Sequence, residues 1–582
     1  MASFSIPDEK GRILQLNSGA SLGNVFASYG VDFESNKGKI RVSSQVKKLL
    51  TNADDADFNG YAAAIVPYST DGTNGKLFAV SDKAFSTDFT NPIGTWTKET
   101  VGNEPNVGNT VTDAVVFDGL TLVADATNIN AWNGSTWTNN YWTSTLGQAA
   151  LTSGQRHLMK VGSDGNLYIV DRGNKLYRVH PVDGATVTGQ GTLDLSATNY
   201  RFQSMAATST RLFIGAQDLG GGDGVILEWD MSPDSVAPNK IHKVGAQGVP
   251  CIAVWNDVAI AVLTSGKVKY FDNLKFVDYD NVEFPVPANF RLSDNFIHPN
   301  GWTIIDDLPH FLAMGRSATQ NVPNSVKETD WAFPAAVWCL DPSIGLYPRF
   351  PIGTGESTQS DYGKPAMKEV GALFAYKAGR QDETKFLCSY EYYLANGTDV
   401  RSVLAYFDNA NTQASRAWLA TPFSMSFREA WKNLETFHKP MPTGCSIRVY
   451  TRTEDEDPVR FDGAYASTTQ INTASIGYDI EKGDLAYIKM GPGSGQWIRI
   501  DAVEQSSGTT SITFESANTF AVAGNSAVLE IFKFRYMGTI TSSDYTQMNV
   551  ADTGIKRKRQ FLFEFIQAAN KEIEVDAILV TT

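Results

Sequence analysis

The sequence predicts an all-β protein: a β-propeller of about seven blades, followed by an antiparallel β-sandwich that carries a small inserted β-barrel-like unit. Three observations predict this fold class. A strand–turn–strand pattern recurs along most of the chain, the composition is rich in Thr, Ser, Asn and Gly, and longer strand-like segments replace the repeat near residue 410. Recurrence at a fixed period indicates a repeat architecture, and these residue types favour strands and turns over helices.

The repeating unit is clearest in residues 166–179. An apolar run ends at Asp171, Arg172-Gly173-Asn174 supply a turn, and a second run follows from Leu176 to Val179. A Gly among polar residues between two apolar runs predicts a β-hairpin. Imperfect copies of this unit lie at 61–67 with 76–82, 114–125 with 129–134, 205–215 with 225–230, 251–263 with 267–272, 302–305 with 311–315 and 335–341, and 371–376 with 385–390 and 400–408.

The spacing of these units favours propeller blades. They begin roughly 45–55 residues apart, and near 70 for the last, whereas a propeller blade takes about 40–50 residues. Near-continuous apolar runs such as Ile252 to Trp255 suit a sheet that is covered on both faces. We count seven units, although six or eight would also fit the spacing. The alternative is a pair of β-sandwiches, which are also all-β and rich in turns.

Four regions follow from this pattern. Residues 1–58 are broken by glycines and show no sustained period, so we expect an N-terminal arm that packs on another surface, with a strand near 39–42 and a possible short serine-capped helix over 43–50. The propeller is expected over 59–410. The sandwich is expected over 411–466 and 527–582, and the inserted small β domain over 467–526.

Composition excludes several classes of function. The net charge is −14 with only 19% charged residues, which disfavours a grip on DNA or on an anionic membrane. No apolar run approaches the roughly 18 residues of a membrane span, and the first residues do not resemble a secretory signal, so we expect folding in a cytoplasm without a membrane anchor. The four cysteines are far apart, which favours buried free thiols over disulfides.

Motifs for catalysis are not found in the sequence. The six histidines are dispersed without a zinc pattern, Gly491-Pro492-Gly493-Ser494-Gly495 does not have the spacing of a hydrolase elbow, and Gly266-Lys267 lacks a phosphate-loop context. We therefore expect a protein that is not an enzyme, with no catalytic, cofactor-binding or metal-binding residues.

One stretch resembles the start of a Ca²⁺ loop. Asp55, Asp57 and Asn59 alternate and are followed by Gly60, but Val66 stands where the bidentate Glu is expected. Ordinary polar residues of a linker explain the stretch more simply, so a Ca²⁺ site is the weaker hypothesis.

Aromatic and basic residues raise two further alternatives. Trp132, Trp137, Tyr141 and Trp142 could bind a glycan or a receptor, although packing between blades explains them better. The segment Asn133–Trp137 keeps the GxxW end of a sialidase-type Asp-box turn without its Ser-x-Asp, so a propeller glycosidase is only the third hypothesis. The basic run 556–559 is expected in a solvated turn.

The segments Gly38–Ser43, Asn133–Thr138 and Phe427–Lys432, together with a blade array followed by a sandwich, resemble virion proteins of tailed bacteriophages. The layout is similar to the tail nozzle or muzzle proteins of short-tailed phages, which carry a β-propeller on a β-rich stem. The resemblance implies a homo-oligomeric ring, typically a hexamer, that joins portal, adaptor or other tail proteins and conducts DNA. This chain is shorter than many nozzle proteins.

We therefore expect a structural protein of a phage tail that is assembled in the host cytoplasm. The arm would dock on neighbouring proteins, the sandwich would build the ring wall and the propeller would project outward. An acidic wall suits a channel through which DNA slides without specific binding. The main alternative is a receptor- or glycan-binding propeller at a tail tip.

Overall fold

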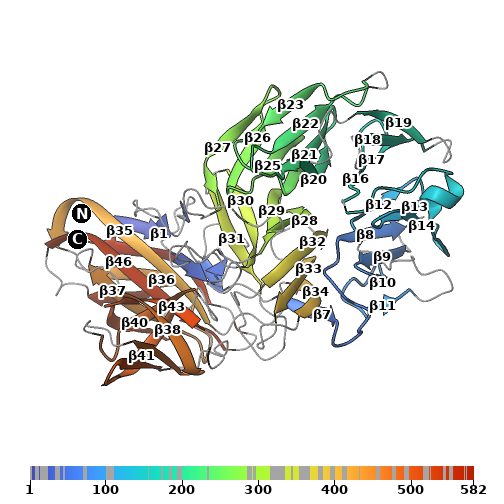
Figure 1. Cartoon of the computed structure of the whole chain (residues 1–582). Coiled ribbons are helices and arrows are strands. Elements are labelled where there is room, and N and C mark those ends of the chain that lie inside the picture. Colours follow the sequence, from blue (N-terminus) through green and yellow to red (C-terminus); the bar gives the residue numbers. More distant parts are fainter. Residues whose placement is uncertain are drawn as a thin grey trace.

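A computed structural model shows a nearly all-β chain (Figure 1). Among the described residues the single helical element is the π-helix η1 (Tyr141–Thr145), and no helix there is long and apolar enough to cross a membrane. The structure describes residues 3–6, 12–13, 24–25, 27–29, 31–32, 40–42, 46–69, 75–99, 111–154, 156–171, 175–181, 187–192, 199–232, 235–284, 292, 296–314, 335–342, 345–352, 367–377, 385–393, 400–408, 416–430, 433–453, 459–474, 480–490, 497–515, 524, 526–541, 545–549, 555–568, 571 and 573–581.

Seven antiparallel sheets of four strands account for most of the described first 408 residues. The first three are β8 (Ala64–Ser69), β9 (Gly75–Val80), β10 (Ala84–Asp88) and β11 (Thr97–Lys98); β12 (Asp113–Phe117), β13 (Leu120–Ala124), β14 (Ile129–Trp132) and β15 (Trp137–Thr138); and β16 (Met159–Val161), β17 (Leu167–Asp171), β18 (Lys175–Val179) and β19 (Val187–Thr192). The expected hairpin of residues 166–179 is β17 paired with β18, and its turn residues 172–174 lie outside the described residues.

The remaining four sheets continue in chain order except for the last strand. They are β20 (Tyr200–Ala207), β21 (Leu212–Asp218), β22 (Val225–Trp229) and β23 (Lys240–Lys243); β24 (Cys251–Trp255), β25 (Val258–Val262), β26 (Lys267–Phe271) and β27 (Phe276–Glu283); β28 (Ile297–Ile305), β29 (Leu308–Ala313), β30 (Ala336–Asp341) and β31 (Gly345–Pro351); and β32 (Met367–Lys377), β33 (Lys385–Tyr393), β34 (Val400–Asp408) and β7 (Lys47–Thr51). We call these sheets the first to the seventh.

Tight turns join the first two strands in several sheets. In the second sheet Asp118 and Gly119 have φ of 49° and 72°, and in the fifth sheet Asn256 and Asp257 have φ of 49° and 63°. Two successive residues with positive φ match the right-handed twist of a hairpin, and Asn, Asp and Gly adopt this conformation most easily. The sequence thus encodes these hairpins locally.

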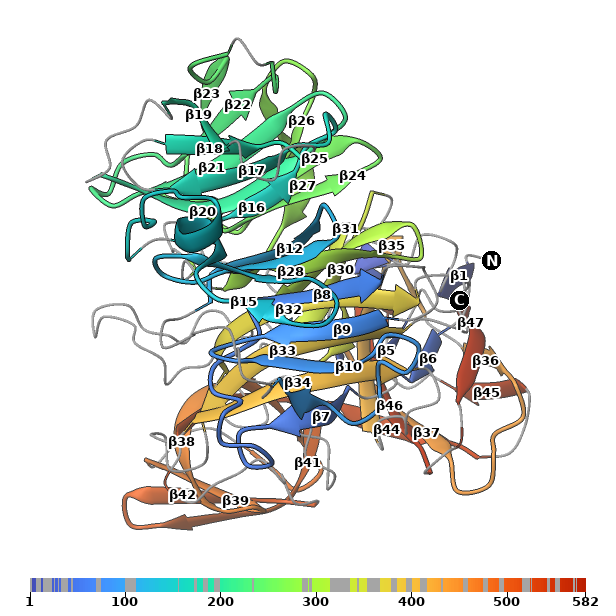
Figure 2. The same ribbon diagram turned by 90° about the vertical axis from the view of Figure 1, so that its right-hand side faces the viewer.

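The seven sheets form a closed, propeller-like ring (Figures 1 and 2). The first strand of each sheet contacts the first strand of the next, from β8 through β12, β16, β20, β24 and β28 to β32, and β32 contacts β8 again. Hydrogen bonds join neighbouring sheets: the backbone N–H of Val249 donates to Gln203 Oε1 at 2.7 Å, and that of Ala62 donates to Ser389 Oγ at 2.8 Å. The faces between sheets are apolar, as the continuous apolar runs predict.

The fourth strand of the seventh sheet comes from the N-terminal part of the chain. In β7, Leu50 pairs with Leu404 of β34 and Thr51 pairs with Val403. Leu50 is buried in a cluster with Phe58 and Leu404. The short helix considered for residues 43–50 is wrong, because burial of Leu50 at the open edge of β34 outweighs local helix propensity.

Earlier N-terminal strands pair with strands of the C-terminal sheets, so the described strands of residues 1–58 pack on the rest of the same chain. These strands are β1 (Ser3–Ile6), β2 (Arg12–Ile13), β3 (Asn24–Val25), β4 (Ala27–Tyr29), β5 (Val31–Asp32) and β6 (Ile40–Val42). β1 and β6 pair with β47, β5 pairs with β6, and β4 pairs with β35. β2 and β3 form a two-stranded parallel sheet.

Two larger antiparallel sheets lie at the C-terminal end. The six-stranded sheet has the order β45-β36-β47-β6-β5 with β1 beside β47, and the five-stranded sheet has the order β4-β35-β46-β37-β44. Their C-terminal strands are β35 (Arg416–Ala430), β36 (Asn433–His438), β37 (Ser446–Thr453), β44 (Arg535–Ile540), β45 (Tyr545–Asn549), β46 (Ile555–Ile566) and β47 (Glu574–Thr581). Both chain termini therefore lie at this end of the molecule (Figure 1).

A closed six-stranded barrel is inserted between β37 and β44. Its strands are β38 (Val459–Ser467), β39 (Gln470–Ala474), β40 (Leu485–Met490), β41 (Trp497–Ser506), β42 (Thr509–Phe514) and β43 (Ser526–Phe532). The inserted unit spans 459–532, wider than the expected 467–526, because β38 and β43 pair with each other as barrel strands. Residues 491–495, considered for a hydrolase elbow, lie outside the described residues.

Candidate functional site

The centre of the ring is where a propeller-like fold brings the most chain segments together, so it is the first candidate site. The sixth sheet sends a bulge there. The pairing of β28 with β29 is interrupted between Ile297 and Trp302, which places His298-Pro299-Asn300-Gly301 outside the regular ladder. Pro cannot donate to a ladder and Gly often marks a bulge, so this sequence bends the strand locally.

Asn300 connects the sixth sheet to three others. Its Nδ2 donates to the carbonyl oxygen of Ala63, directly before β8, at 3.0 Å, and to Oδ1 of Asp113 on β12 at 2.6 Å. Its Oδ1 accepts a hydrogen bond from Nζ of Lys160 on β16 at 3.0 Å. One amide therefore bridges across the central axis of the ring.

Asp113 is fully engaged at this point. It is 1% exposed, its Oδ2 accepts the backbone N–H of Met159 at 2.7 Å, and its Oδ1 accepts the N–H of Ala114 at 2.8 Å in addition to Asn300. A buried carboxylate is costly unless it is hydrogen-bonded, and here both oxygens have donors. Because the carboxylate is buried and both of its oxygens already accept hydrogen bonds from the protein, a role as general base is disfavoured.

His298 is held neutral in the same cluster. Its Nδ1 accepts the backbone N–H of Asn300 at 3.1 Å, which leaves the proton on Nε2, and its ring lies 5.4 Å from that of Tyr61. Complete burial lowers the pKa of His298 well below its usual value, and the nearby charges of Arg156 and Lys160 lower it further. Burial also raises the pKa of Tyr61. Neither side chain is charged at neutral pH.

The backbones of the first, sixth and seventh sheets approach each other closely near the axial residues. A side chain at Gly371 of β32 would clash with the carbonyl oxygen of Ala62, and one at Gly301 would press against His298 and Gly371. The first, sixth and seventh sheets thus meet at backbone distance. We call Asp113, Lys160, His298 and Asn300 the axial cluster.

A second buried polar group lies inside the sixth sheet. Arg349 is fully buried, donates Nη2 to Asp306 at 2.5 Å and donates Nη1 to Nε2 of His310 at 3.0 Å. Because guanidinium can only donate, His310 carries its proton on Nδ1, which donates to the carbonyl oxygen of Leu308 at 2.9 Å. Burial, and then the charge of Arg349, lower the pKa of His310 well below its usual value.

The aromatic residues considered for ligand binding are mostly core residues. Trp132, Trp137 and Trp142 are 5%, 3% and 0% exposed, and only Tyr141 is partly exposed. Trp132 and Trp137 pack against Phe78 of the first sheet at ring distances of 5.8 and 5.7 Å. Packing between sheets, the interpretation favoured from the sequence, is confirmed for the three tryptophans.

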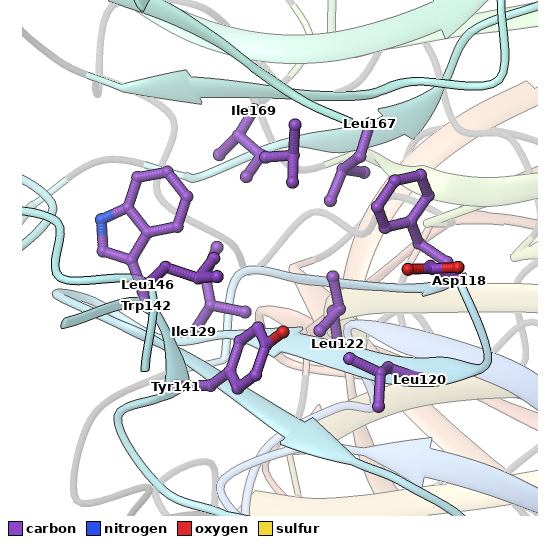
Figure 3. A pocket seen from close by; sticks show the side chains of 11 residues that line it. Asp118, Leu120, Leu122, Ile129, Tyr141, Trp142, Leu146, Leu167 and Ile169 are labelled. Atoms are coloured by element: carbon purple, nitrogen blue, oxygen red, sulfur yellow. The ribbon is translucent and has the colours of Figure 1, made fainter. Parts of the chain in front are cut away.

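A small pocket lies beside Trp142, between the second and third sheets (Figure 3). Its walls are apolar, with Leu122, Ile129, Leu167 and Ile169 around the hollow, and Asp118 sits at its margin. The free space is about 20 Å³, roughly room for one water molecule. As it stands the pocket is too small for a sugar or a cofactor.

The residues considered for Ca²⁺ are engaged in structural contacts. Asp55 Oδ1 accepts the N–H of Asp57, Asp57 pairs with Lys98 at 2.5 Å, and Asn59 Nδ2 donates to Asp82 at 3.3 Å. Lys98 lowers the pKa of Asp57 through its hydrogen bond and its charge. Among the described residues no three His, Cys, Asp or Glu side chains converge as a metal site would require.

Two other sequence expectations have a clear outcome. Cys251, Cys339, Cys388 and Cys445 are buried and free, as expected. The basic run 556–559 lies within β46, not in a turn, because β46 continues to Ile555 in its pairing with β35.

Sequence reasoning missed the axial cluster. His298 was one of six dispersed histidines, and Asp113 and Asn300 belong to no motif. The available signal was the Pro-Asn-Gly interruption of an apolar strand, which predicts a bulge but not what the bulge reaches.

Comparisons with known proteins give no family. No protein-family model matches the chain, and no curated protein matches it. Among solved structures, the computationally designed Ika8 protein is 11% identical, covering 64% of this chain and 96% of its own, with a TM-score of 0.32. YCF48 bound to a D1 peptide is 10% identical (68% and 97% covered, TM-score 0.35), and the Cps50 (Swd1) β-propeller domain of Myceliophteria thermophila is 9% identical (60% and 97%, TM-score 0.35). Similarities this low carry no functional conclusion.

Proposed function

We propose that this chain is a structural protein of a phage tail, in which copies assemble into a ring, with a hexamer as the expected order. In this proposal the seven four-stranded sheets are the blades of one propeller closed by β7. The two C-terminal sheets form a sandwich that builds the ring wall and joins portal, adaptor or other tail proteins. The resemblance to nozzle proteins and the net charge of −14 support this assignment.

The observation that carries the proposal is the contrast between the ring's centre and the chain's C-terminal end. Asn300 and Asp113 of the axial cluster are hydrogen-bonded to each other and to three neighbouring segments, which suits a rigid body better than a reactive site. The C-terminal sheets, in contrast, end at one side on β44 and β45, and no described strand pairs with the outer side of these two. Open strand edges favour association with other chains.

The axial cluster also places a limit on how DNA could pass. Because Asn300 of the sixth sheet bonds to Asp113 and Lys160 of the second and third sheets, we infer that DNA would pass through the centre of an assembled ring of copies and not through the propeller itself. The propeller would then project from that wall.

A glycan- or receptor-binding propeller is the main competitor. It loses support because three of the four aromatic residues that suggested it are buried between sheets. Light scattering on the purified chain separates the two hypotheses. We expect a single species at a fixed multiple of 63.5 kDa, six for the hexamer. A strict monomer that binds or cleaves glycans would contradict the structural assignment.

A further inference from the structure

Three side chains of the axial cluster carry the groups that take part in an amide exchange. Lys160 of β16 brings an amine, Asn300 in the bulge of β28 brings a carboxamide, and Asp113 of β12 brings a carboxylate. Nζ of Lys160 donates to Oδ1 of Asn300 at 3.0 Å, and Nδ2 of Asn300 donates to Oδ1 of Asp113 at 2.6 Å. The amine and the carboxylate therefore bind the two ends of one amide group.

The chemistry of these partners fixes the orientation of the amide. A lysine ammonium group only donates hydrogen bonds, and an ionised carboxylate only accepts them, so the oxygen of Asn300 faces Lys160 and its nitrogen faces Asp113. Because a C=O bond is about 1.2 Å long, the 3.0 Å hydrogen bond places Nζ of Lys160 within about 4.2 Å of Cγ of Asn300. A small rotation of the flexible lysine side chain brings the amine into contact with that carbon.

We propose that Lys160 and Asn300 react to form an intramolecular isopeptide bond, which covalently joins the third and sixth sheets. In its uncharged form, Nζ attacks Cγ with its lone pair, and a bond forms between these two atoms. A proton moves from Nζ to Nδ2, the bond between Cγ and Nδ2 breaks, and Nδ2 leaves as ammonia. Nothing is oxidised or reduced, and the step needs no external reactant.

Asp113 orients the amide and stabilises the charge on the departing nitrogen. Its carboxylate is 1% exposed and accepts a hydrogen bond from Nδ2, so it lies beside the positive charge that forms when Nδ2 takes up a proton. A negative group that is already in place at such a charge lowers the barrier, and burial strengthens the attraction. The carboxylate does not have to act as a general base, because the proton passes from the attacking nitrogen to the leaving nitrogen.

Folding brings the reacting groups together. Lys160 and Asn300 are 140 positions apart in the sequence, so the reaction follows closure of the ring. Asn300 is then held in place, because its backbone N–H donates to Nδ1 of His298 and its Nδ2 also donates to the carbonyl oxygen of Ala63. Groups held in contact in this way reach effective molarities of about 10⁵–10⁸ M, which compensates for the low reactivity of an amide.

The isopeptide bond goes beyond the proposed role in a phage tail and does not depend on it, since all the reacting groups belong to one chain. Like a disulfide, the bond closes a long loop and restricts the unfolded chain. Each chain reacts once with itself and turns over no substrate. The product is a propeller-like body whose third and sixth sheets, which are not neighbours in the ring, are covalently linked.

Mass spectrometry of the intact, denatured chain tests the bond. We expect the mass to be lower than that of the sequence by one ammonia molecule, and a tryptic digest to contain two peptides joined through Lys160 and Asn300. Lys160→Arg keeps a positive charge and a hydrogen-bond donor but removes the nucleophile, so it should retain the full mass. Lys482→Arg is the matched control, because Lys482 is exposed and pairs with Asp501 in the inserted barrel. It should lose ammonia as the unmodified chain does.

The same experiment recognises a different loss of ammonia. Asn300 precedes Gly301, and the backbone nitrogen of a glycine in this position can attack the asparagine side chain and also release ammonia. That reaction would persist in Lys160→Arg and would give no joined peptides, so either result overturns the isopeptide bond. The full sequence mass in the unmodified chain would overturn it as well. The joined peptides of the unmodified chain decide the question even if Lys160→Arg folds poorly.

The rate of the reaction tests the carboxylate. Asp113→Asn removes the charge with little change in size, so we expect the joined peptides to appear roughly tenfold more slowly, or slower still, after synthesis. Asp501→Asn, in the inserted barrel, should leave the rate unchanged. Equal rates in Asp113→Asn and the unmodified chain would overturn the role of Asp113. Loss of both the joined peptides and the cooperative melting transition would support the requirement for folding.

Discussion

The second and seventh sheets of the ring look alike but are assembled in different ways. All four strands of the second sheet lie within residues 113–138, and tight turns join them. The seventh sheet takes three strands from residues 367–408 and its fourth, β7, from residues 47–51. The side chain of Asn52 donates to the carbonyl oxygen of Val400, 348 residues away in sequence. One sheet is closed by local turns and the other by the two ends of the ring.

From this difference we predict that the closing strand β7 contributes strongly to the ring's stability. Closing a long loop costs entropy that grows only slowly with its length, about 0.6 kcal/mol for each doubling, so even this distant closure is affordable. Burial of apolar side chains must then supply the free energy that offsets this entropy cost. Leu50 packs with Phe58, Leu387 and Leu404 between the seventh and first sheets. Contacts of β7 therefore add to the direct contacts of β32 and β33 with the first sheet in keeping the ring closed.

Removal of the closing strand should have the largest effect. We expect deletion of residues 1–51 to abolish the ring's cooperative unfolding transition, because β34 and the cluster around Leu404 lose their cover together. Stabilities of folded proteins are about 5–15 kcal/mol, so loss of one whole strand consumes most of that range. Differential scanning calorimetry measures the transition.

Deletion of residues 1–45 is the matched control. It removes β1 to β6, as the longer deletion does, and leaves β7 in place. The ring transition should then persist. Closure by β7 would be refuted if both deletions gave the same transition as the complete chain.

Single substitutions can also compare the seventh sheet, which is closed by a distant strand, with a sheet built from local turns. Leu50 and Leu176 are 6% and 0% exposed, in the seventh and third sheets. We expect Leu50→Ala and Leu176→Ala each to cost about 2–5 kcal/mol in the free energy of unfolding, because both leave a cavity in a packed core.

Hydrogen exchange tells the two variants apart. Leu50→Ala should speed exchange in β34 and in the first sheet, which Leu50 joins across the closure. Leu176→Ala should speed exchange around the third and fourth sheets, where Leu176 packs. Identical exchange patterns would mean that the ring opens as one unit and that its closure has no special weakness.

The local sheets were predictable from the sequence, and the closure was not. Hairpins such as Leu167–Val179 are encoded by apolar runs and turn residues only a few positions apart. The pairing of Leu50 with Leu404 has no local signal, because Lys47–Thr51 is a short amphipathic segment that fits a helix or a strand equally well. Only the open edge of β34, formed far along the chain, decides between them.

The axial cluster tests whether the centre depends on contacts between sheets. Asn300→Ala would leave Asp113 and Lys160 short of a partner, and we expect it to cost about 1–3 kcal/mol in the free energy of unfolding. Asn239→Ala is the control, because Asn239 is exposed and its side chain bonds only to Asp230 of the same sheet among the described residues, while its backbone bond to Glu228 would remain. It should cost less than about 1 kcal/mol. Urea unfolding measures both losses of stability. Equal losses would show that the hydrogen bonds of Asn300 between sheets stabilise the protein no more than a hydrogen bond within one sheet.

Like the pairing of β7 with β34, the candidate site depends on residues that are far apart in the sequence. The bulge at Pro299-Asn300-Gly301 is visible as a break in an apolar strand, yet its partners Ala63, Asp113 and Lys160 come from three other sheets. Ring geometry brings them together, and no spacing in the sequence encodes that meeting.

A change of pH compares one histidine at the axis with one inside a sheet. His298 and His310 are both neutral in the folded chain because their pKa values lie well below the usual value. In the unfolded chain each takes up a proton near pH 6.5. Unfolding therefore binds protons as the pH falls below about 6.5, and stability should decrease by up to about 1.4 kcal/mol per pH unit for each histidine.

Urea unfolding between pH 7.5 and 4.5 measures how the free energy of unfolding changes with pH. His298→Gln and His310→Gln should each remove the contribution of one histidine to that pH dependence. The informative step is to repeat the titration in Leu50→Ala. His298 is held among groups from different sheets, including Arg156 and Lys160, so its pKa should rise toward the usual value if a weakened closure admits water to the axis. His310 is held by Arg349 and Leu308 of its own sheet and should keep its low pKa. An NMR titration that moves both histidines equally would contradict the division between local sheets and a non-local closure.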